Sequence, residues 1–207
     1  MPDGFGSMTG TIDQNGEALI VSEISEALIL NTNFVGSYSV DWNGRSTMAL
    51  QISPTNTYSA IAYFFGQNEG FLMKTSEKDF GRGEVALGSF KQQAPGPFTV
   101  TSASGSFRTN TTVPRANQSG KNDAGLTIFD GSGTVASIID MTVSTNLYHF
   151  DFSGTYTVSA NGRGTLTFTS PSPDRSVVFW VVSPTELVGI FTVNTPETSP
   201  VLLEYEK

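Results

Sequence analysis

The sequence predicts an all-β fold: two tandem antiparallel up-and-down meander modules, arranged as small barrels or as one fused barrel or sandwich. Three observations lead to this prediction. Short runs rich in Val, Ile, Thr, Phe and Tyr alternate with clusters of Gly, Asn, Asp, Ser and Pro at intervals of about 8 to 12 residues. Two Asn-Gly pairs, Asn43-Gly44 and Asn161-Gly162, each separate alternating segments, which is typical of β-hairpins with type I′ turns. One long stretch of the chain recurs further along it.

The recurring stretch is FVGSYSVDWNGRSTMALQIS from Phe34 and FSGTYTVSANGRGTLTFTSP from Phe152. The two copies lie 118 positions apart and share eight residues out of twenty. The match continues at nearly the same spacing, in 59–65 against 176–182 and in 85–91 against 201–207. Self-similarity at a fixed period is the sequence signature of a repeat architecture, so we interpret the chain as one β unit written twice.

This interpretation divides the chain into a first module at 1–93, a Pro/Gly linker at 94–97 and a second module at 98–207. The modules differ at their starts. The second opens with a strand-like stretch at 98–107, and nothing before Gly4 matches it in the first. The chain is then a fragment, or another chain or the second module fills the missing strand position.

Within each module we expect about seven or eight short strands. Because sequential strands usually pair, they should form a meander, and a meander hides its edges by closing. Further turns are predicted at Asp130–Gly133 and at Asp13–Gly16. Residues 17–30 have helical spacing at Ile20, Ile24 and Leu28, but their counterpart at 135–143 alternates, so we favour a strand.

Two strands are apolar on both faces, at 60–65 and at 177–182. A strand with water on one side alternates apolar and polar residues, so both faces of these strands should be covered. One face would meet the core of its own module and the other face would meet the sister module.

Composition excludes several classes of function. The net charge of −8 and the pI of about 4.5 disfavour binding to nucleic acids. Cysteine is absent, which removes disulfides, thiolate nucleophiles and Cys-based zinc sites. A single histidine leaves no His-rich metal site, and no apolar run reaches membrane-spanning length. We therefore expect no cofactor, no metal and no membrane span. No basic and apolar leader appears in the first residues, so we expect the secretion signal to be missing from this chain.

At this point the residues resemble a known family. The pattern runs GTYTVSANGRGTLT from Gly154, then VVSPTE from Val181, and ends with PVLLEYEK. DGSGTV from Asp130 and ASGSF from Ala103 also fit. This resembles the tandem β-rich repeats of large, mostly uncharacterised secreted or surface proteins of acidobacteria and related bacteria. The resemblance implies an exported location, secreted or at the cell surface, and a lipocalin-like, barrel-forming meander. It supplies no catalytic residue.

Candidate catalytic residues are few. His149 lies on the same strand face as Asp151, and such a pair could orient an imidazole for base chemistry. Asp140 stands between Ile139 and Met141 and could be buried. Carboxylates could also pair across strands, as in glycosidases. The candidates for such a pair are Asp140, Asp151, Glu186, Glu23, Glu26 and Glu69. For all of these, solvated strand faces are the simpler explanation.

Other polar motifs can be explained by a structural role as well as by a functional one. Arg45 and Arg163 follow the two Asn-Gly turns and could bind an anion, although pairing with a cross-strand carboxylate, or covering the barrel end with the side-chain stem, is the simpler expectation. The turn at Asp130 and the pair Asn122-Asp123 contain fragments of a calcium loop, but a full set of oxygen ligands is absent.

The residues most able to stack on a sugar or an apolar ligand are aromatic: Trp42, Tyr63, Tyr148, Tyr156 and Trp180. Trp42 precedes a hairpin turn, so we expect it to be exposed. Core packing is the simpler expectation for the others.

The sequence favours a non-enzymatic, exported β-repeat protein that acts as a surface, adhesive or structural binding module. Its partners would be a cell-surface glycan or protein, or further copies of itself. One alternative is a carrier of a small apolar ligand with a calycin-like barrel interior. Another is a barrel enzyme, a cyclase or hydrolase, that uses His149 or a buried carboxylate. The state of the barrel interior discriminates among the three.

Overall fold

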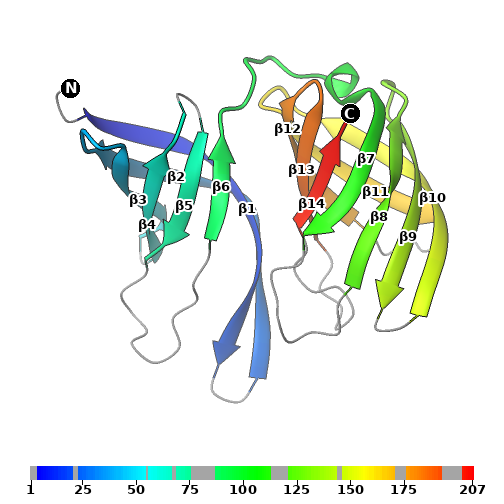
Figure 1. Cartoon of the computed structure of the whole chain (residues 1–207), viewed down its shortest axis with the longest axis horizontal. Coiled ribbons are helices and arrows are strands. Elements are labelled where there is room, and N and C mark those ends of the chain that lie inside the picture. Colours follow the sequence, from blue (N-terminus) through cyan, green and yellow to red (C-terminus); the bar gives the residue numbers. More distant parts are fainter. Residues whose placement is uncertain are drawn as a thin grey trace. The chain divides into compact units, whose positions relative to one another are not determined.

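The computed structural model describes residues 4–20, 23–54, 56–66, 69–75, 87–112, 121–143, 146–170, 176–192 and 202–207. It confirms the all-β prediction, with two antiparallel sheets (Figure 1). The chain divides into two compact units, one of Met1–Asp13 and Ile29–Gln92 and the other of Gln14–Leu28 and Gln93–Lys207. The two sheets are described separately below.

The second sheet is a closed eight-stranded barrel. Each strand pairs antiparallel with the next in the chain, and the last pairs with the first, which confirms the up-and-down meander. Figure 1 shows these strands in green to red. They are β7 (Gly105–Thr112), β8 (Lys121–Phe129), β9 (Thr134–Val143), β10 (Asn146–Val158), β11 (Arg163–Ser170), β12 (Ser176–Ser183), β13 (Glu186–Phe191) and β14 (Leu202–Glu206).

Inward-facing side chains, which alternate with outward-facing ones along each strand, fill the barrel. Along β10 and β11 the buried positions recur at every second residue, as the pleat requires. Phe129 lies at the centre of the aromatic core, and its ring centroid is 5.7 Å from that of Phe107, 4.9 Å from Tyr156, 5.7 Å from Phe179 and 6.0 Å from Tyr205. Such edge-to-face and tilted pairs stabilise a core beyond the area they bury.

One end of the barrel is closed by the segment that precedes β7. A short 3-10 helix, η1 (Val100–Ala103), lies there, and Ala103 is fully buried. The Tyr156 hydroxyl donates to the Val100 carbonyl oxygen at 3.1 Å and accepts from the Gly131 N–H at 2.9 Å. The prediction of one strand over 98–107 is therefore wrong for 98–104, because these residues turn to cover the core.

The first sheet is open and curls as a half-barrel. Its strands follow chain order: β1 (Gly4–Ile20), β2 (Glu23–Val40), β3 (Arg45–Ser53), β4 (Asn56–Phe64), β5 (Glu69–Lys74) and β6 (Leu87–Lys91). Six strands are found in the described residues, instead of the expected seven or eight.

The long β1–β2 pair decides two open points of the sequence analysis. Residues 17–20 and 23–30 are strand, as favoured. The turn predicted at Asp13–Gly16 is wrong, because these residues lie inside β1. Asn and Gly raise the local preference for a turn, and pairing along a long partner strand overrides that preference.

The Asn-Gly turns are hairpin turns, as predicted, but they are not of type I′. The Gly44 N–H donates to the Asp41 carbonyl oxygen at 3.0 Å, and the Asp41 N–H donates to Arg45 at 2.7 Å. Three residues therefore form the loop, and Gly44 takes the left-handed conformation at its end, with φ of 81°. This is the type I turn with a bulge that three-residue hairpin loops adopt. The turn before Arg163 has the same bonds, and Gly162 has a φ of 88°.

The pairing registers of the two sheets coincide over five strands. Tyr38 lies opposite Met48, as Tyr156 lies opposite Leu166. At the last strand Phe90 lies opposite Gly70, whereas Tyr205 lies opposite Leu187. Phe90 therefore matches Tyr205, so the sequence match of 85–91 with 201–207 was wrong by one residue. A slip of one residue matters because it reverses the face on which every side chain lies.

Corresponding pairs of the two sheets differ in side-chain volume. In the barrel Gly164 lies opposite Phe179, and a Cβ at Gly164 would overlap the Phe179 ring. In the open sheet the corresponding pair is Ser46 opposite Ala62, so both residues are small. The pairs Gly189/Leu203 and Leu72/Gly88 instead have the large and the small residue interchanged.

We predict that Gly164→Ser and Phe179→Ala are coupled. The first change overpacks the core and should cost about 1–3 kcal/mol, and the second leaves a cavity and should cost about 3–5 kcal/mol. The double variant recreates the Ser46/Ala62 pair and should cost less than the sum by about 0.5–3 kcal/mol. Denaturation followed by Trp180 fluorescence in a Trp42→Phe background measures this. Gly164→Ser with Met141→Ala is the control, expected to be additive; additivity in the test pair would refute the coupling.

Candidate functional site

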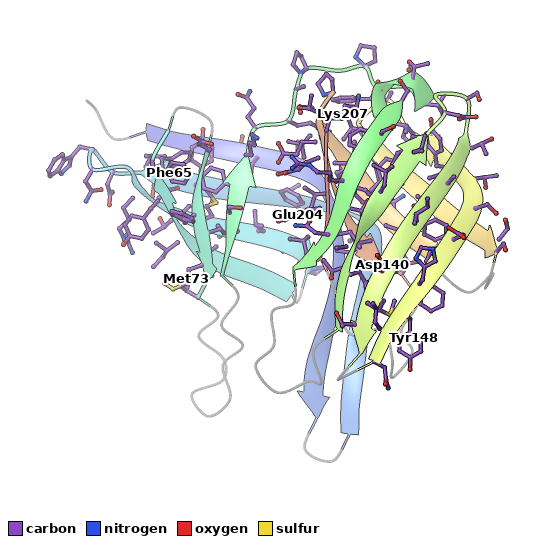
Figure 2. The ribbon with its side chains drawn as sticks, turned by 45° about the vertical axis from the view of Figure 1, so that its right-hand side comes forward. Phe65, Met73, Asp140, Tyr148, Glu204 and Lys207 are labelled. Atoms are coloured by element: carbon purple, nitrogen blue, oxygen red, sulfur yellow. The ribbon has the colours of Figure 1, made fainter. Side chains whose placement is uncertain are left out.

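The three catalytic candidates meet on the outer wall of the barrel. His149 lies opposite Asp140 in the β9–β10 register, and Asp151 follows two positions along β10. The His149 Nδ1 atom is 2.7 Å from Asp140 Oδ1, and its Nε2 atom is 3.7 Å from Asp151 Oδ1. Their side chains are 61%, 60% and 74% exposed, so Asp140 is not buried and lies on a solvated strand face. Figure 2 shows Asp140 on the outer surface of the yellow-green strands.

This arrangement stabilises the protonated imidazole. The hydrogen bond with Asp140 is the main cause that raises the pKa of His149 above its ordinary value, with partial desolvation opposing it and the charges of Asp140 and Asp151 adding to it. Both ring nitrogens face carboxylates, so neither is aimed at a hydroxyl nucleophile in the way that triad chemistry requires. At this exposure water screens the charges, and the cluster acts as a surface ion pair.

The barrel interior is packed. Tyr148, Phe150 and Phe152 stack in a ladder along β10, with ring centroids 6.2 Å and 5.5 Å apart. Beside the ladder, among residues that include Phe152 and Phe168, lies a cavity of about 10 Å³. That is room for about one water molecule and far below the several hundred Å³ of a ligand pocket. The described interior therefore favours a structural core over a carrier lumen.

The loop at Asp130 is a turn. The Asp130 carboxylate accepts N–H bonds from Ser132, Gly133 and Thr134 at 2.8, 3.0 and 2.8 Å. Hydrogen bonds from Ser132, side chain first and then backbone, are the main cause that holds the pKa of Asp130 far below its ordinary value. Among the residues that the structure describes, no group of three or more His, Asp or Glu side chains could hold a metal ion. The side chains of Glu23 and Glu26 lie outside the description.

The first sheet carries an open cavity of about 470 Å³ on β2, β3 and β4. Two cross-strand rows of small and hydroxyl-bearing residues line much of it. They are Ser37–Ala49–Ser59 and Ser39–Thr47–Ile61. Within the second row, the Ser39 and Thr47 hydroxyls are hydrogen-bonded at 2.7 Å. We call this the hydroxyl cavity.

Three exposed aromatic side chains adjoin the hydroxyl cavity. Tyr63, Phe65 and Phe71 are 51%, 59% and 62% exposed, and we call them the aromatic patch. Tyr63 lies opposite Phe71 on one side and opposite Arg45, a residue of the cavity lining, on the other. The Phe65 and Phe71 ring centroids are 4.9 Å apart. Figure 2 shows Phe65 and Met73 along the same margin of this sheet.

Arg45 places a positive charge beside the aromatic patch. Its Nη1 atom lies 3.9 Å from Asp41 Oδ2, across the hairpin turn, and its side chain is 34% exposed. A carboxylate on the opposite side of the hairpin is one of the two structural expectations for Arg45. A partly exposed guanidinium beside aromatic rings offers both hydrogen-bond donors and a flat face to a ligand.

The other aromatic candidates are scattered. Trp42 is 80% exposed at its turn, as expected. Tyr148 is 44% exposed at the end of the barrel ladder, and Trp180 is half-buried on β12. The expectation that both faces of the doubly apolar strands are covered is wrong for β4, where Tyr63 is exposed. The sequence analysis did not include Phe65 and Phe71 among the aromatic residues able to stack on a ligand. Phe71 lies in β5, where Gly70 and Leu72 are on one face and Phe71 and Met73 are on the other. This strand is therefore apolar on both faces, which is the pattern already noted at 60–65 and 177–182.

Comparisons with known proteins add no relative. No protein-family model, no curated protein and no solved structure matches the chain. Within the described residues, no helix has the length and apolar character needed to cross a membrane.

We predict that Asp140→Asn lowers the pKa of His149 toward 6.5. The loss of the charged acceptor removes the main interaction that favours the imidazolium. The stability that this pair contributes is present below the unfolded-state pKa and is lost as pH rises through the higher folded-state pKa. His149 is the only histidine, so one imidazole NMR signal reports the titration. Asp151→Asn should have a smaller effect, and an equal pKa in wild type and Asp140→Asn would contradict the assignment.

Proposed function

We propose that this protein is a non-enzymatic, exported binding module that recognises glycan chains through the aromatic patch and the hydroxyl cavity. One observation carries the proposal: three exposed aromatic rings stand beside an open cavity rich in hydroxyls on the first sheet. Exposed apolar groups of this kind, gathered on one surface, mark interaction sites.

The chemistry of the surface favours a ligand that is both polar and apolar. Aromatic faces of Tyr63 and Phe71 offer flat area at low cost in side-chain entropy, which suits the C–H face of a sugar ring. Hydroxyls of Ser37, Ser39 and Thr47 can exchange hydrogen bonds with sugar hydroxyls. A purely apolar partner would leave the remaining hydrogen-bonding capacity of these hydroxyls unused, which is unfavourable on burial.

The two alternative functions have less support. A carrier needs an open lumen, and the described barrel interior is packed around Phe129. An enzyme built on His149 needs a shielded site with a poised group, and His149 is well exposed between two carboxylates. The net charge of −8 also favours a neutral ligand over an anionic one.

We predict that Tyr63→Ala with Phe71→Ala lowers glycan affinity by at least about tenfold, because each lost aromatic contact is worth about 1 kcal/mol or more. A panel of neutral polysaccharides and oligosaccharides on an array identifies the ligand, and titration calorimetry measures its affinity. Tyr148→Ala, at an exposed aromatic of the other unit, is the matched control and should bind as wild type. Equal affinity of all three proteins, or no glycan bound by wild type, would refute the proposal.

A further inference from the structure

We propose that the open first sheet is the acceptor for a β-hairpin from a partner polypeptide, which takes the place that β7 and β8 hold in the barrel. This inference does not rest on glycan binding. It follows from a comparison of the two sheets within this one chain.

Strands β2 to β6 reproduce β10 to β14 at the level of single bonds. The Phe64 N–H donates to Gly44 at 3.0 Å, and the Val181 N–H donates to Gly162 at 2.9 Å. In the neighbouring β4–β5 pair, the Thr75 N–H donates to the Ser59 carbonyl oxygen at 2.7 Å, as Thr192 donates to Ser176 in the β12–β13 pair at 2.9 Å. In the last pair Phe90 lies opposite Gly70, as Tyr205 lies opposite Leu187, so β6 stands where β14 stands in the barrel.

Strand β1 stands where β9 stands. In the barrel Gly154 of β10 lies opposite Val135 of β9. In the open sheet Gly36 occupies the same register position in β2, and a Cβ added there would lie 3.2 Å from the Met8 side chain of β1. The two outer strands of the open sheet therefore correspond to the two barrel strands that pair with β7 and β8.

The inner face of the open sheet lacks the cover that β7 and β8 supply. In the barrel Tyr156 and Tyr205 are each 3% exposed and contact Phe129 of β8, which packs on Phe107 of β7. The corresponding Tyr38 and Phe90 are only half-buried. Among the described side chains of this sheet, the buried apolar ones are Ala60 and Ala62. The fitting hairpin therefore carries large apolar residues, such as Phe, on the face it turns inward.

A buried polar atom without a hydrogen-bond partner lies on the same inner face. Ser46 is fully buried on the inner face, and its hydroxyl has no hydrogen-bond partner in the structure. In the barrel this end is covered by the segment before β7, where Gln93 Nε2 donates to the Val181 carbonyl oxygen at 2.7 Å. A donor that includes such a segment would bring polar groups to this end of the sheet, where an unsatisfied hydroxyl is costly.

A separate hairpin is favoured over the hairpin of a second copy. A second copy could insert its own β7 and β8 only by opening its own barrel, so one closed barrel would be exchanged for another with no net gain. A hairpin from a partner closes the open sheet and opens nothing, and its main-chain bonds provide affinity as in other cases of strand addition.

The probe is a synthetic peptide of residues 105–129, added to the full chain. We expect 1:1 binding in titration calorimetry and slowing of amide exchange in β6 and in residues 4–9 on the order of tenfold. The control peptide has Phe107→Ser and Phe129→Ser, which keeps the backbone and removes the inward aromatics, and it should not bind. Peptide 163–183, which covers the inner strands β11 and β12, should not bind either.

A second experiment links the donor segment covalently to the chain and so does not depend on the solubility of the peptide. Residues 93–129 are copied ahead of Gly4 through a flexible Gly/Ser linker, and this chain should show the same protection of β6 while it stays monomeric by sedimentation. Binding without protection of β6 would mean exchange into the barrel and would overturn the proposal. A wild-type dimer with β6 already protected would assign the edges to a second copy and would also overturn it. Glycan binding is measured separately, so failure of one proposal leaves the other intact.

Discussion

Closure of the backbone ladder between β14 and β7 is the constraint on which the barrel depends. A strand at a sheet edge leaves a row of N–H and C=O groups without partners, and such groups must be paired or exposed to water. Pairing of Leu202–Glu206 with Arg108–Thr112 removes both edges at once. Only a closed wall lets every second side chain point into a dry interior. The central position of Phe129, in contact with rings from four other strands, is a consequence of that closure.

The first sheet shows what the same register gives without closure. Its hairpin turns, its cross-strand pairs and its Ser39–Thr47 hydroxyl bond match those of the barrel, where Thr157 bonds to Thr165. Its inner aromatic residues are nevertheless only half-buried. Local pairing is therefore insufficient to bury a face, and burial requires a wall on the other side. The differences in side-chain volume between corresponding pairs, as between Gly164/Phe179 and Ser46/Ala62, indicate that each sheet has its own packing on a shared register.

The candidate sites of this protein lie on outer faces, and the barrel interior is filled by side chains. The interior holds a ladder of aromatic rings and a chain of hydroxyl bonds through Thr109, Thr127 and Ser137, each 2.7 Å long. These bonds satisfy polar groups that would otherwise be buried in the barrel without a hydrogen-bond partner. The His149 cluster and the aromatic patch face outward, where water screens charge and a large ligand can approach. Such surfaces suit recognition better than they suit acid–base catalysis.

The sequence alone determined the all-β class, the position of the Asn-Gly hairpins and the exposure of Trp42. These features depend on local preferences and on alternation, which a linear pattern records. The tertiary structure decided that Asp140 pairs with His149, that Phe65 and Phe71 join Tyr63, that Asp13–Gly16 continues a strand, and that one sheet closes while the other stays open. Each of these depends on cross-strand register or on the number of walls around a core. Such long-range pairings are set by the packing of the whole sheet, and no short window of sequence contains them.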